Sequence, residues 1–397
     1  MEIKNKNVGV VGIGVKTEII TPKDNLLEVI KNTFTKNKNL LENNDIVCIT
    51  EAVVAITQNN FVQINDITQE IKQKLNITEN STIGIIYPIL SRNRFSMILK
   101  AIAKCVPKGK IIVQLSFPSD EQGNPVINKN FLKKIGKQNK DKLTLNELPT
   151  KELIHPITGI NYIEMYQEII QQQGAKAEIY LANNTKYLVE KKPEGIIVCN
   201  VHNRQEALEE IKKQNYKNVI TLQDICSNPK NKAYCEWGLL GSNILDPEKE
   251  LLKLAPKNAN VLAKQIQTFI KKEFKKNVEI IIYGDGAYKD PETGIYELAD
   301  PVCAFGITDG IKNKNRIGVK TKYLMQKYYS QGKTKQEILK LIQKEKNKIK
   351  KTDKKNEFAS QGTTPRKIEN LVSSLADLIS GSADANTPIV IVKNYLE

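Results

Sequence analysis

Short apolar runs alternate along the chain with longer segments in which apolar residues recur every three or four positions. The short runs are rich in Ile and Val and predict β-strands, whereas the longer period predicts amphipathic helices. The predicted strands are Val8–Val11, Ile46–Thr50, Thr82–Tyr87, Lys110–Leu115, Ala177–Leu181, Gly195–Asn200, Asn218–Thr221, Val278–Tyr283 and Pro388–Lys393. The predicted helices are Asp24–Thr35, Arg92–Val106, Asn161–Gln173, Arg204–Gln214, Ala259–Phe274, Lys335–Lys350 and Pro365–Ser380. This alternation predicts a mixed α/β or α+β fold.

The length of 397 residues exceeds what one compact core usually holds, so we expect more than one domain. Residues 84–235 have their own strand–helix rhythm and predict an inserted α/β domain. The insertion would divide a second domain into an N-terminal part, residues 1–83, and a C-terminal part, residues 236–397. No long linker rich in Pro, Gly or Ser marks these boundaries in the sequence.

The composition is that of a chain with an ordinary core, since 40% of the residues are apolar. No apolar run approaches the ~20 residues that a membrane span needs, so we expect a cytoplasmic protein without a membrane partner. The six cysteines are dispersed and predict reduced thiols in the core. An alternative is a zinc site formed by Cys199, His202, Cys226 and Cys235, although its spacing is loose.

The net charge of +16 raises nucleic acid as a partner, but the charge is concentrated in one place. Residues 312–355 contain sixteen basic and three acidic residues, and therefore carry thirteen of the sixteen excess charges. We interpret the basic segment, residues 311–357, as a solvated helix that frays into a mobile loop, with a nucleic-acid surface as the alternative. Only five of the 60 basic residues are arginines, which makes each arginine informative because its rigid fork suits phosphate and carboxylate.

Two stretches predict anion sites at helix starts, where free N–H groups and the helix dipole favour negative charge. In YPILSRNRF, a strand ends and Ser91 precedes a helix with Arg92 and Arg94. The stretch ASQGTTPR places Thr363, Thr364 and Arg366 around a proline at a predicted helix start. In both stretches, ordinary helix capping is the alternative.

Two further segments carry candidate side chains just beyond predicted strands. The stretch LSFPSDEQGNP contains Asp120 and Glu121, and its carboxylates could contact substrate or metal, although a turn explains the same residues. His202 and Arg204 follow another strand, and His202 could act as a general base.

The stretch YGDGAYKDPETG follows the apolar run Val278–Ile282 and is the strongest candidate for a metal site. Several carboxylates stand beside glycines within a short segment, and hard cations that carry phosphate take oxygen ligands. The candidate metal ligands are Asp285, Asp290, Glu297 and Asp300, and the candidate phosphate-binding residues are Gly284, Gly286, Ser242 and Asn243. The alternative for Gly284–Gly286 is a hairpin turn.

The order of these motifs resembles the gamma-glutamyl ligase family of the deazaflavin coenzyme F-420, in particular its longer bacterial members. The stretches that carry the resemblance are GIGVKTEIITPKDNL, DIVCITEAVVA, GLLGSN, VEIIIYGDGAYKD and IENLVSSLADLISGSADANTPIVIV. The resemblance covers nearly the whole chain for the longer members, and about 1–83 and 236–397 for the archaeal enzymes. The fold it implies is a ligase-like core with an inserted α/β domain.

The resemblance also implies a nucleotide-dependent ligase that uses GTP or ATP with Mg²⁺ or Mn²⁺, and a homodimer. It implies that Asp285 binds metal and that Ser242 and Asn243 belong to the nucleotide site. From the predicted anion site at its helix start, we also expect Arg366 to act with Asp285 in catalysis. Two positions depart from the family pattern: Leu240 stands where an acidic metal ligand is expected, and Ile56 where a basic residue is expected.

The leading hypothesis is therefore a gamma-glutamyl ligase that joins L-glutamate to a small acceptor through an acyl phosphate. A folate-type acceptor is the alternative within the same chemistry. A basic nucleic-acid-binding protein and a binder that has lost the metal and the activity are the alternatives from other classes. Leu240, which stands where a metal ligand is expected, is the reason for considering a binder that has lost the metal.

Overall fold

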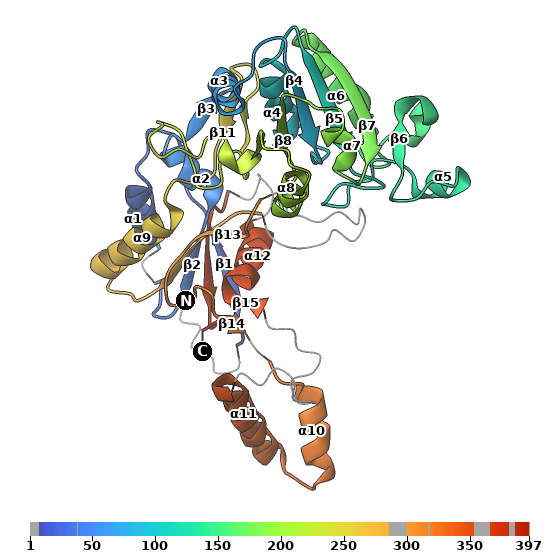
Figure 1. The fold of residues 1–397 in the computed structure, drawn as a ribbon. Coiled ribbons are helices and arrows are strands. Elements are labelled where there is room, and N and C mark those ends of the chain that lie inside the picture. The colour runs from blue at the N-terminus through green and yellow to red at the C-terminus, as the bar shows by residue number, and fades with distance from the viewer. Residues whose placement is uncertain are drawn as a thin grey trace.

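The protein is described from a computed structural model, which describes residues 8–37, 39–285, 300–316, 318–352, 366–380 and 386–396. Its strands form two main sheets and two smaller ones. Two of its helices form a hairpin that extends away from both main sheets (Figure 1). The described residues therefore form a mixed α/β fold, as predicted. No helix among them is long and apolar enough to cross a membrane.

The first main sheet has five strands in the order β1-β16-β2-β12-β13. These strands are β1 (Val11–Val15), β16 (Ile389–Lys393), β2 (Ile46–Thr50), β12 (Glu279–Tyr283) and β13 (Ala304–Ile307). The central pair, β2 and β12, is parallel, and the other neighbours are antiparallel. Helix α12 (Ile368–Ser380) covers one face, and α1 (Leu26–Lys36) and α9 (Ala259–Phe274) lie on the other (Figure 1).

The apolar sequence of β2 explains why both faces of this sheet are covered. Successive side chains of a strand point to opposite faces. Val47 and Ile49 pack in the cluster that contains α1 and α9, whereas Ile46 and Cys48 pack with Val372 of α12. A strand that is buried on both faces needs an unbroken apolar run, which is what Ile46–Thr50 supplies.

The second main sheet has six strands in the order β6-β7-β5-β4-β8-β9. These are β6 (Lys142–Thr144), β7 (Lys176–Ala182), β5 (Lys110–Leu115), β4 (Thr82–Ile86), β8 (Gly195–Val198) and β9 (Val219–Thr221). All neighbours are parallel except β6 and β7. The chain starts at β4, moves outward to β5 and β7, and returns to β8 on the other side of β4. The interface between β4 and β8 is therefore a topological switch point, where doubly wound sheets bind ligands.

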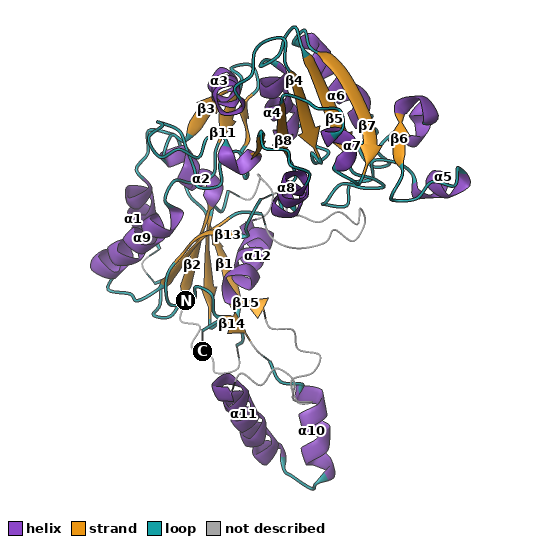
Figure 2. Ribbon diagram, viewed as in Figure 1, coloured by secondary structure: helices purple, strands orange, loops and turns teal. Residues whose placement is uncertain are grey.

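Helices cover both faces of the six-stranded sheet (Figure 2). One face packs with α3 (Ile64–Leu75), α4 (Arg94–Ala103) and α6 (Tyr162–Gln172), and the other with α7 (Lys186–Val189) and α8 (Arg204–Lys213). The sheet is formed by residues 82–221, close to the predicted insertion at 84–235. The domain boundaries themselves stay a prediction.

The remaining described elements are short or lie outside the two main sheets. They are α2 (Glu51–Thr57), β3 (Phe61–Gln63), α5 (Lys129–Lys134), β10 (Asn243–Asp246), β11 (Leu251–Lys253), β14 (Asn315–Arg316), α10 (Thr321–Ser330), α11 (Lys335–Thr352) and β15 (Arg366–Lys367). Strands β10, β11 and β3 form a three-stranded sheet, and β14 pairs with β15.

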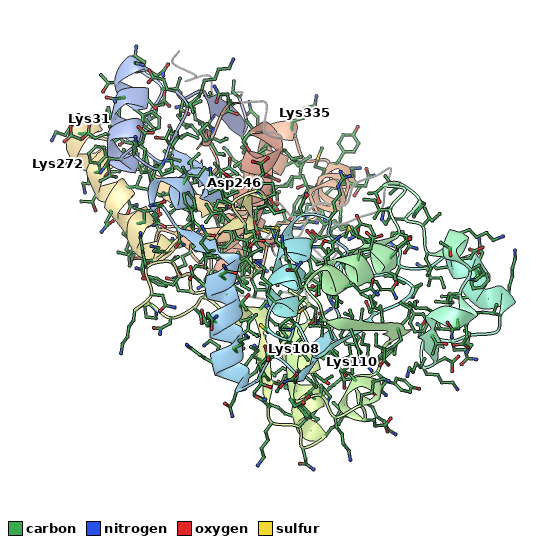
Figure 3. The ribbon with its side chains drawn as sticks, turned by 90° about the horizontal axis from the view of Figure 1, so that it is seen from above. Lys31, Lys108, Lys110, Asp246, Lys272 and Lys335 are labelled. Atoms are coloured by element: carbon green, nitrogen blue, oxygen red, sulfur yellow. The ribbon has the colours of Figure 1, made fainter. Side chains whose placement is uncertain are left out.

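The basic segment forms the helical hairpin α10–α11, which has a small core of its own that includes Leu324, Ile338 and Ile342. The predicted helix Lys335–Lys350 corresponds to α11, whereas α10 was not predicted. The predicted mobile loop at 353–357 lies outside the described residues. Lysines also lie over other parts of the molecule, among them Lys31 on α1 and Lys272 on α9 (Figure 3).

Most predicted strands and helices are present, with shifted ends. The strand predicted at Val8–Val11 is β1, which begins only at Val11, and the helix predicted from Pro365 is α12, which begins at Ile368. The missed elements include α2, α3 and β13. All six cysteines are buried and free of disulfides, as predicted.

Candidate functional site

Two carboxylates emerge at the same edge of the five-stranded sheet because β2 and β12 are parallel neighbours. Thr50 at the end of β2 pairs with Tyr283 at the end of β12. Glu51 is the next residue after β2, and Asp285 follows β12 after Gly284. The sheet therefore places both side chains just beyond the carboxyl ends of its two central strands.

Asp300 is the third carboxylate of the site and contacts the backbone beside Asp285. The Asp285 N–H donates a hydrogen bond to Asp300 Oδ2 over 3.1 Å. A Cβ atom on Gly284 would lie 2.5 Å from the same oxygen and 2.6 Å from a ring carbon of Phe305. A side chain at position 284 would therefore displace Asp300 or the ring, which explains the glycine before Asp285.

Two cations balance part of this negative charge. Arg94, in the first turn of α4, reaches from the six-stranded sheet and donates from Nη2 to Asp300 Oδ1 over 3.2 Å. Lys253, at the end of β11, donates to both oxygens of Glu51 over 2.8 and 2.7 Å. With every group ionised, three carboxylates and two cations leave a net charge of −1, which favours an additional cation. We call these five residues the Asp285 cluster.

Burial and mutual repulsion shift the protonation of the cluster. Burial, and then the negative charge of Asp300, raise the pKa of Asp285 to about 7, although Arg94 opposes the shift. Burial also raises the pKa of Glu51, against the lowering effect of Lys253. Asp285 therefore takes up a proton near neutral pH, and a bound cation would favour its ionised form.

The Gly-Ser-Asn turn lies against the Asp285 cluster through Gly241. Gly241 has a left-handed φ of 72°, and a Cβ atom there would lie 3.4 Å from Asp300 Oδ1. Ser242 is fully buried, and its hydroxyl has no hydrogen-bond partner among the described residues. Leu240 is buried in the apolar core, and Asn243 is exposed at the start of β10. Of the two predicted turn residues, Ser242 is therefore the one with an unused buried oxygen.

The donor set fits a hard cation in part. Asp285 and Asp300 offer carboxylate oxygens, and Mg²⁺ is usually held by one or two carboxylates together with phosphate oxygens and water. Within the residues that the structure describes, no group of three or more His, Cys, Asp or Glu side chains is arranged to hold a metal ion. The predicted residues Gly286, Asp290 and Glu297 lie outside the described residues.

The predicted anion site at YPILSRNRF divides into three different roles. Ser91 Oγ accepts hydrogen bonds from the N–H groups of Asn93 and Phe95 at the start of α4, whose N-cap residue is Asn93. Arg92 is exposed, whereas Arg94 belongs to the Asp285 cluster. The predicted helix start at Arg92 is therefore two residues early, and that difference separates the two arginines.

The second predicted anion site differs from the prediction at Arg366. Arg366 is exposed in β15 and pairs with Arg316 of β14, ahead of α12, rather than lying in the first turn of the helix. The start of α12 instead carries Glu369, which is buried and accepts a hydrogen bond from the N–H of Asn313 over 3.2 Å. Thr363 and Thr364 lie outside the described residues.

The Asp120 carboxylate is surrounded by hydrogen-bond donors of its own turn and of the loop after β4. Its carboxylate accepts hydrogen bonds from the N–H groups of Leu90, Gln122 and Asn124 and from the Asn124 side chain. Burial nevertheless raises the pKa of Asp120. The side chain is thus saturated by donors from its own surroundings.

His202 and Arg204 mark the start of α8. His202 is exposed, and its N–H donates to Glu121. Arg204 donates to the carbonyl of Val201 and to Gln223, and lies 5.8 Å from the ring centroid of Trp237, just before the Gly-Ser-Asn turn. The zinc alternative is not supported among the described residues, which hold no such group of ligands.

Sequence reasoning missed Glu51 and Lys253. A usable signal for Glu51 was its position directly after the predicted strand Ile46–Thr50, which is the same placement that drew attention to Asp285. Lys253 has no comparable signal, because one lysine among 55 is not distinctive. Its pairing with Glu51 depends on the contact between α2 and β11, which a single sequence does not specify.

Comparison with known proteins supplies the family. No curated protein matches the chain. Residues 14–394 match the family described as F420-0:Gamma-glutamyl ligase. The match spans nearly the whole chain, including the six-stranded sheet, and confirms the predicted resemblance. The chain therefore belongs to the F420-0:gamma-glutamyl ligase family, whose members are nucleotide-dependent ligases that add glutamate to coenzyme F420-0.

Proposed function

We propose that Asp285 and Asp300 hold a divalent cation, Mg²⁺ or Mn²⁺, and that this cation binds the phosphates of GTP or ATP during glutamyl transfer. The convergence of Asp285, Asp300 and Arg94, with Gly241 of the Gly-Ser-Asn turn against Asp300, is the observation that carries the proposal. When bound, the cation would bridge phosphate oxygens and neutralise their charge. Asp300 takes the part of the carboxylate that the family pattern places at Leu240.

The reaction proceeds in two balanced steps. An oxygen of the acceptor carboxylate attacks the terminal phosphorus of the nucleotide, and the nucleoside diphosphate leaves. The amino group of L-glutamate then attacks the acyl carbon, so that the C–N bond forms, inorganic phosphate leaves and the nitrogen loses a proton. Catalysis of this kind depends on positioning and on charge stabilisation.

The chain's own groups have distinct parts in the proposal. Arg94 positions Asp300 and adds positive charge near the phosphates. Lys253 favours the ionised form of Glu51 and holds its side chain in place through two hydrogen bonds. Ser242 offers its buried hydroxyl to the nucleotide or the cation. Five further residues stay predictions for the same site: Asp290, Glu297, Gly286, Thr363 and Thr364. The homodimer and the cytoplasmic location also stay predictions.

Metal-dependent turnover tests the proposal. Purified protein is given coenzyme F420-0, L-glutamate, GTP or ATP, and Mg²⁺ or Mn²⁺, and the glutamyl product and nucleoside diphosphate are measured. We expect Asp285→Asn and Asp300→Asn to lower turnover by about 100-fold or more. Asp309→Asn is the matched control, because Asp309 is exposed and forms an ion pair with Lys264 on the surface.

Two outcomes would contradict the proposal. One is equal activity of Asp309→Asn and Asp285→Asn at saturating metal. The other is nucleotide binding by the wild type that does not depend on a divalent cation, which would instead favour a binder without metal chemistry. Transfer to a folate-type acceptor but not to coenzyme F420-0 would keep the metal site and change the acceptor.

A further inference from the structure

A cavity lies at the carboxyl edge of the six-stranded sheet, away from the Asp285 cluster at the end of β12. It has a volume of about 260 Å³ and is lined by residues that follow four parallel strands: Tyr87 after β4, Ser116 after β5, Asn183 after β7 and Asn200 after β8. This is the switch point between β4 and β8, where doubly wound sheets place their ligands. The location is therefore that of a binding site, and the lining decides what it binds.

The ordinary ligand of such an edge, a phosphate at a helix start, is excluded here. The N–H groups of Val201, His202 and Asn203 at the start of α8 already donate to the carboxylate of Glu121. Glu121 thus occupies the place that an external anion would take at this helix. The chain has filled its own anion site with a carboxylate.

The rest of the lining is acidic and rich in hydrogen-bond acceptors. Its eleven residues include four carboxylates and no Lys, Arg or His. Asp120 and Glu121 are saturated by backbone donors, whereas Glu206 and Glu210 have no ion pair or hydrogen bond to their side chains in the described parts of the chain. Glu206 and Glu210 are one helical turn apart on α8, so both face the cavity from the same side.

An unpartnered acceptor in the lining independently indicates a ligand. Asn200 is only 4% exposed, and its side-chain carbonyl oxygen has no hydrogen-bond donor among the described residues. A buried acceptor without a donor destabilises the protein, because it has lost its hydrogen bonds to water without replacement. A ligand that brings an N–H donor into the cavity would recover this energy.

Tyr87, which lines the cavity, also has a strained backbone conformation. Its φ of 51° is rare for a bulky side chain and persists where the surroundings impose it, commonly at ligand sites. Gln114 donates to the Tyr87 hydroxyl over 3.3 Å, which leaves the Tyr87 proton available to a ligand acceptor. The cavity lining therefore includes a hydroxyl donor in addition to its carboxylate acceptors.

We propose that this cavity binds a small molecule with an ammonium group, which donates to Asn200 Oδ1 and is paired by Glu206 and Glu210. A free amino acid and a diamine share this chemistry. The Tyr87 hydroxyl would distinguish them, because only the amino acid carries a carboxylate that accepts its proton. The neighbouring hollow, which shares Asn183 and Glu210, is lined by Lys186, Lys192 and Lys213 and does not extend the acidic lining.

Calorimetric titration of the full chain tests the proposal without nucleotide or coenzyme. The amine probes are 1,4-diaminobutane and L-lysine, and the anionic probes of similar size are succinate and inorganic phosphate. We expect an amine probe to bind at millimolar or lower concentration and the anions not to bind. The double variant Glu206→Gln, Glu210→Gln should weaken amine binding by about tenfold or more, because a charge-assisted hydrogen bond is lost.

Matched variants keep the test decisive. Glu209→Gln removes one carboxylate charge from α8 outside the cavity lining and should leave amine binding unchanged. Asn200→Leu should abolish binding without removing charge, and circular dichroism checks that it folds. Failure of both amine probes to bind, preferential binding of the anions, or equal loss in Glu209→Gln and the double variant would overturn the proposal. None of these results bears on the Asp285 cluster.

Discussion

Asp120 and Asp285 both lie beyond the carboxyl end of a strand, one in each main sheet, but Asp120 is buried and Asp285 half-buried, and their surroundings differ. Asp120 accepts four hydrogen bonds from nearby donors, whereas the Asp285 carboxylate accepts none from the described residues and is repelled by the carboxylates of Asp300, Glu51 and Asp377. A saturated carboxylate organises its loop, and an unsaturated one is available to a ligand. Placement after a strand therefore selects candidates, and the count of donors separates structural residues from binding residues.

The two aspartates should respond in opposite directions to the same substitution. The raised pKa of Asp285, about 7, means that its ionised form costs folding free energy above neutral pH. In metal-free protein, Asp285→Asn should raise the free energy of unfolding by a few kcal/mol near pH 8. Asp120→Asn should lower it by about 3 kcal/mol, because the amide group faces donors that the carboxylate had accepted.

The pH dependence gives this comparison its sign. The stability linked to the raised pKa is fully present below about pH 4, where Asp285 is protonated in both states, and is lost as the pH rises through 7. The gain from Asp285→Asn should therefore shrink as the pH falls. Urea unfolding followed by the fluorescence of Trp237, the single tryptophan, measures it. The comparison is broken if Asp285→Asn destabilises the protein near pH 8.

Gly284→Ala tests how tightly the backbone before Asp285 packs against the carboxylate of Asp300. The new Cβ would lie 2.5 Å from Asp300 Oδ2, so we expect a loss of about 1–3 kcal/mol in the free energy of unfolding and weaker Mg²⁺ binding. Gly9→Ala is the control, because a Cβ there meets nothing within 4 Å. Unfolding midpoints and Mg²⁺ titration distinguish the two variants, and equal results would mean that the site relaxes freely.

The sequence predicted the parts of the fold that depend on local pattern. Strands such as Ile46–Thr50 were found because burial on both faces demands continuous apolar residues, and α9 was found because its apolar period is regular. The edge strand β13 was missed, since its sequence AFGI contains a glycine and lacks the run of Ile and Val that marks the predicted strands. The helix α10 was missed because its sequence, TKYLMQKYYS, has few apolar residues among its polar and basic ones and so shows a weak helical period.

Of the candidate site, the sequence predicted Asp285, Asp300, Arg94 and Ser242, which the structure brings together. Asp300 and Arg94 are 206 positions apart, and their contact follows from the way in which the two main sheets meet. No local pattern specifies that meeting, and the same holds for Glu51 and Lys253, which are 202 positions apart. Chemistry could thus be assigned to single residues, but pairing could not.

Glu121→Gln tests a second structural carboxylate of the six-stranded sheet, which occupies the anion site at the start of α8. Glu121 accepts from three N–H groups at the start of α8, and its negative charge also interacts favourably with the helix dipole. The neutral amide keeps its shape but loses this charge, so we expect a loss of about 1 kcal/mol in the free energy of unfolding.

Glu209→Gln, on the same helix, is the control and should change the free energy of unfolding by much less, because no backbone donor contacts Glu209 in the described residues. Urea midpoints for both variants provide the measurement. A larger loss in Glu209→Gln would mean that general charge on α8 matters more than the filled anion site. A larger loss in Glu121→Gln would indicate that the six-stranded sheet uses this carboxylate as structure, whereas the five-stranded sheet keeps Asp285 available for a cation.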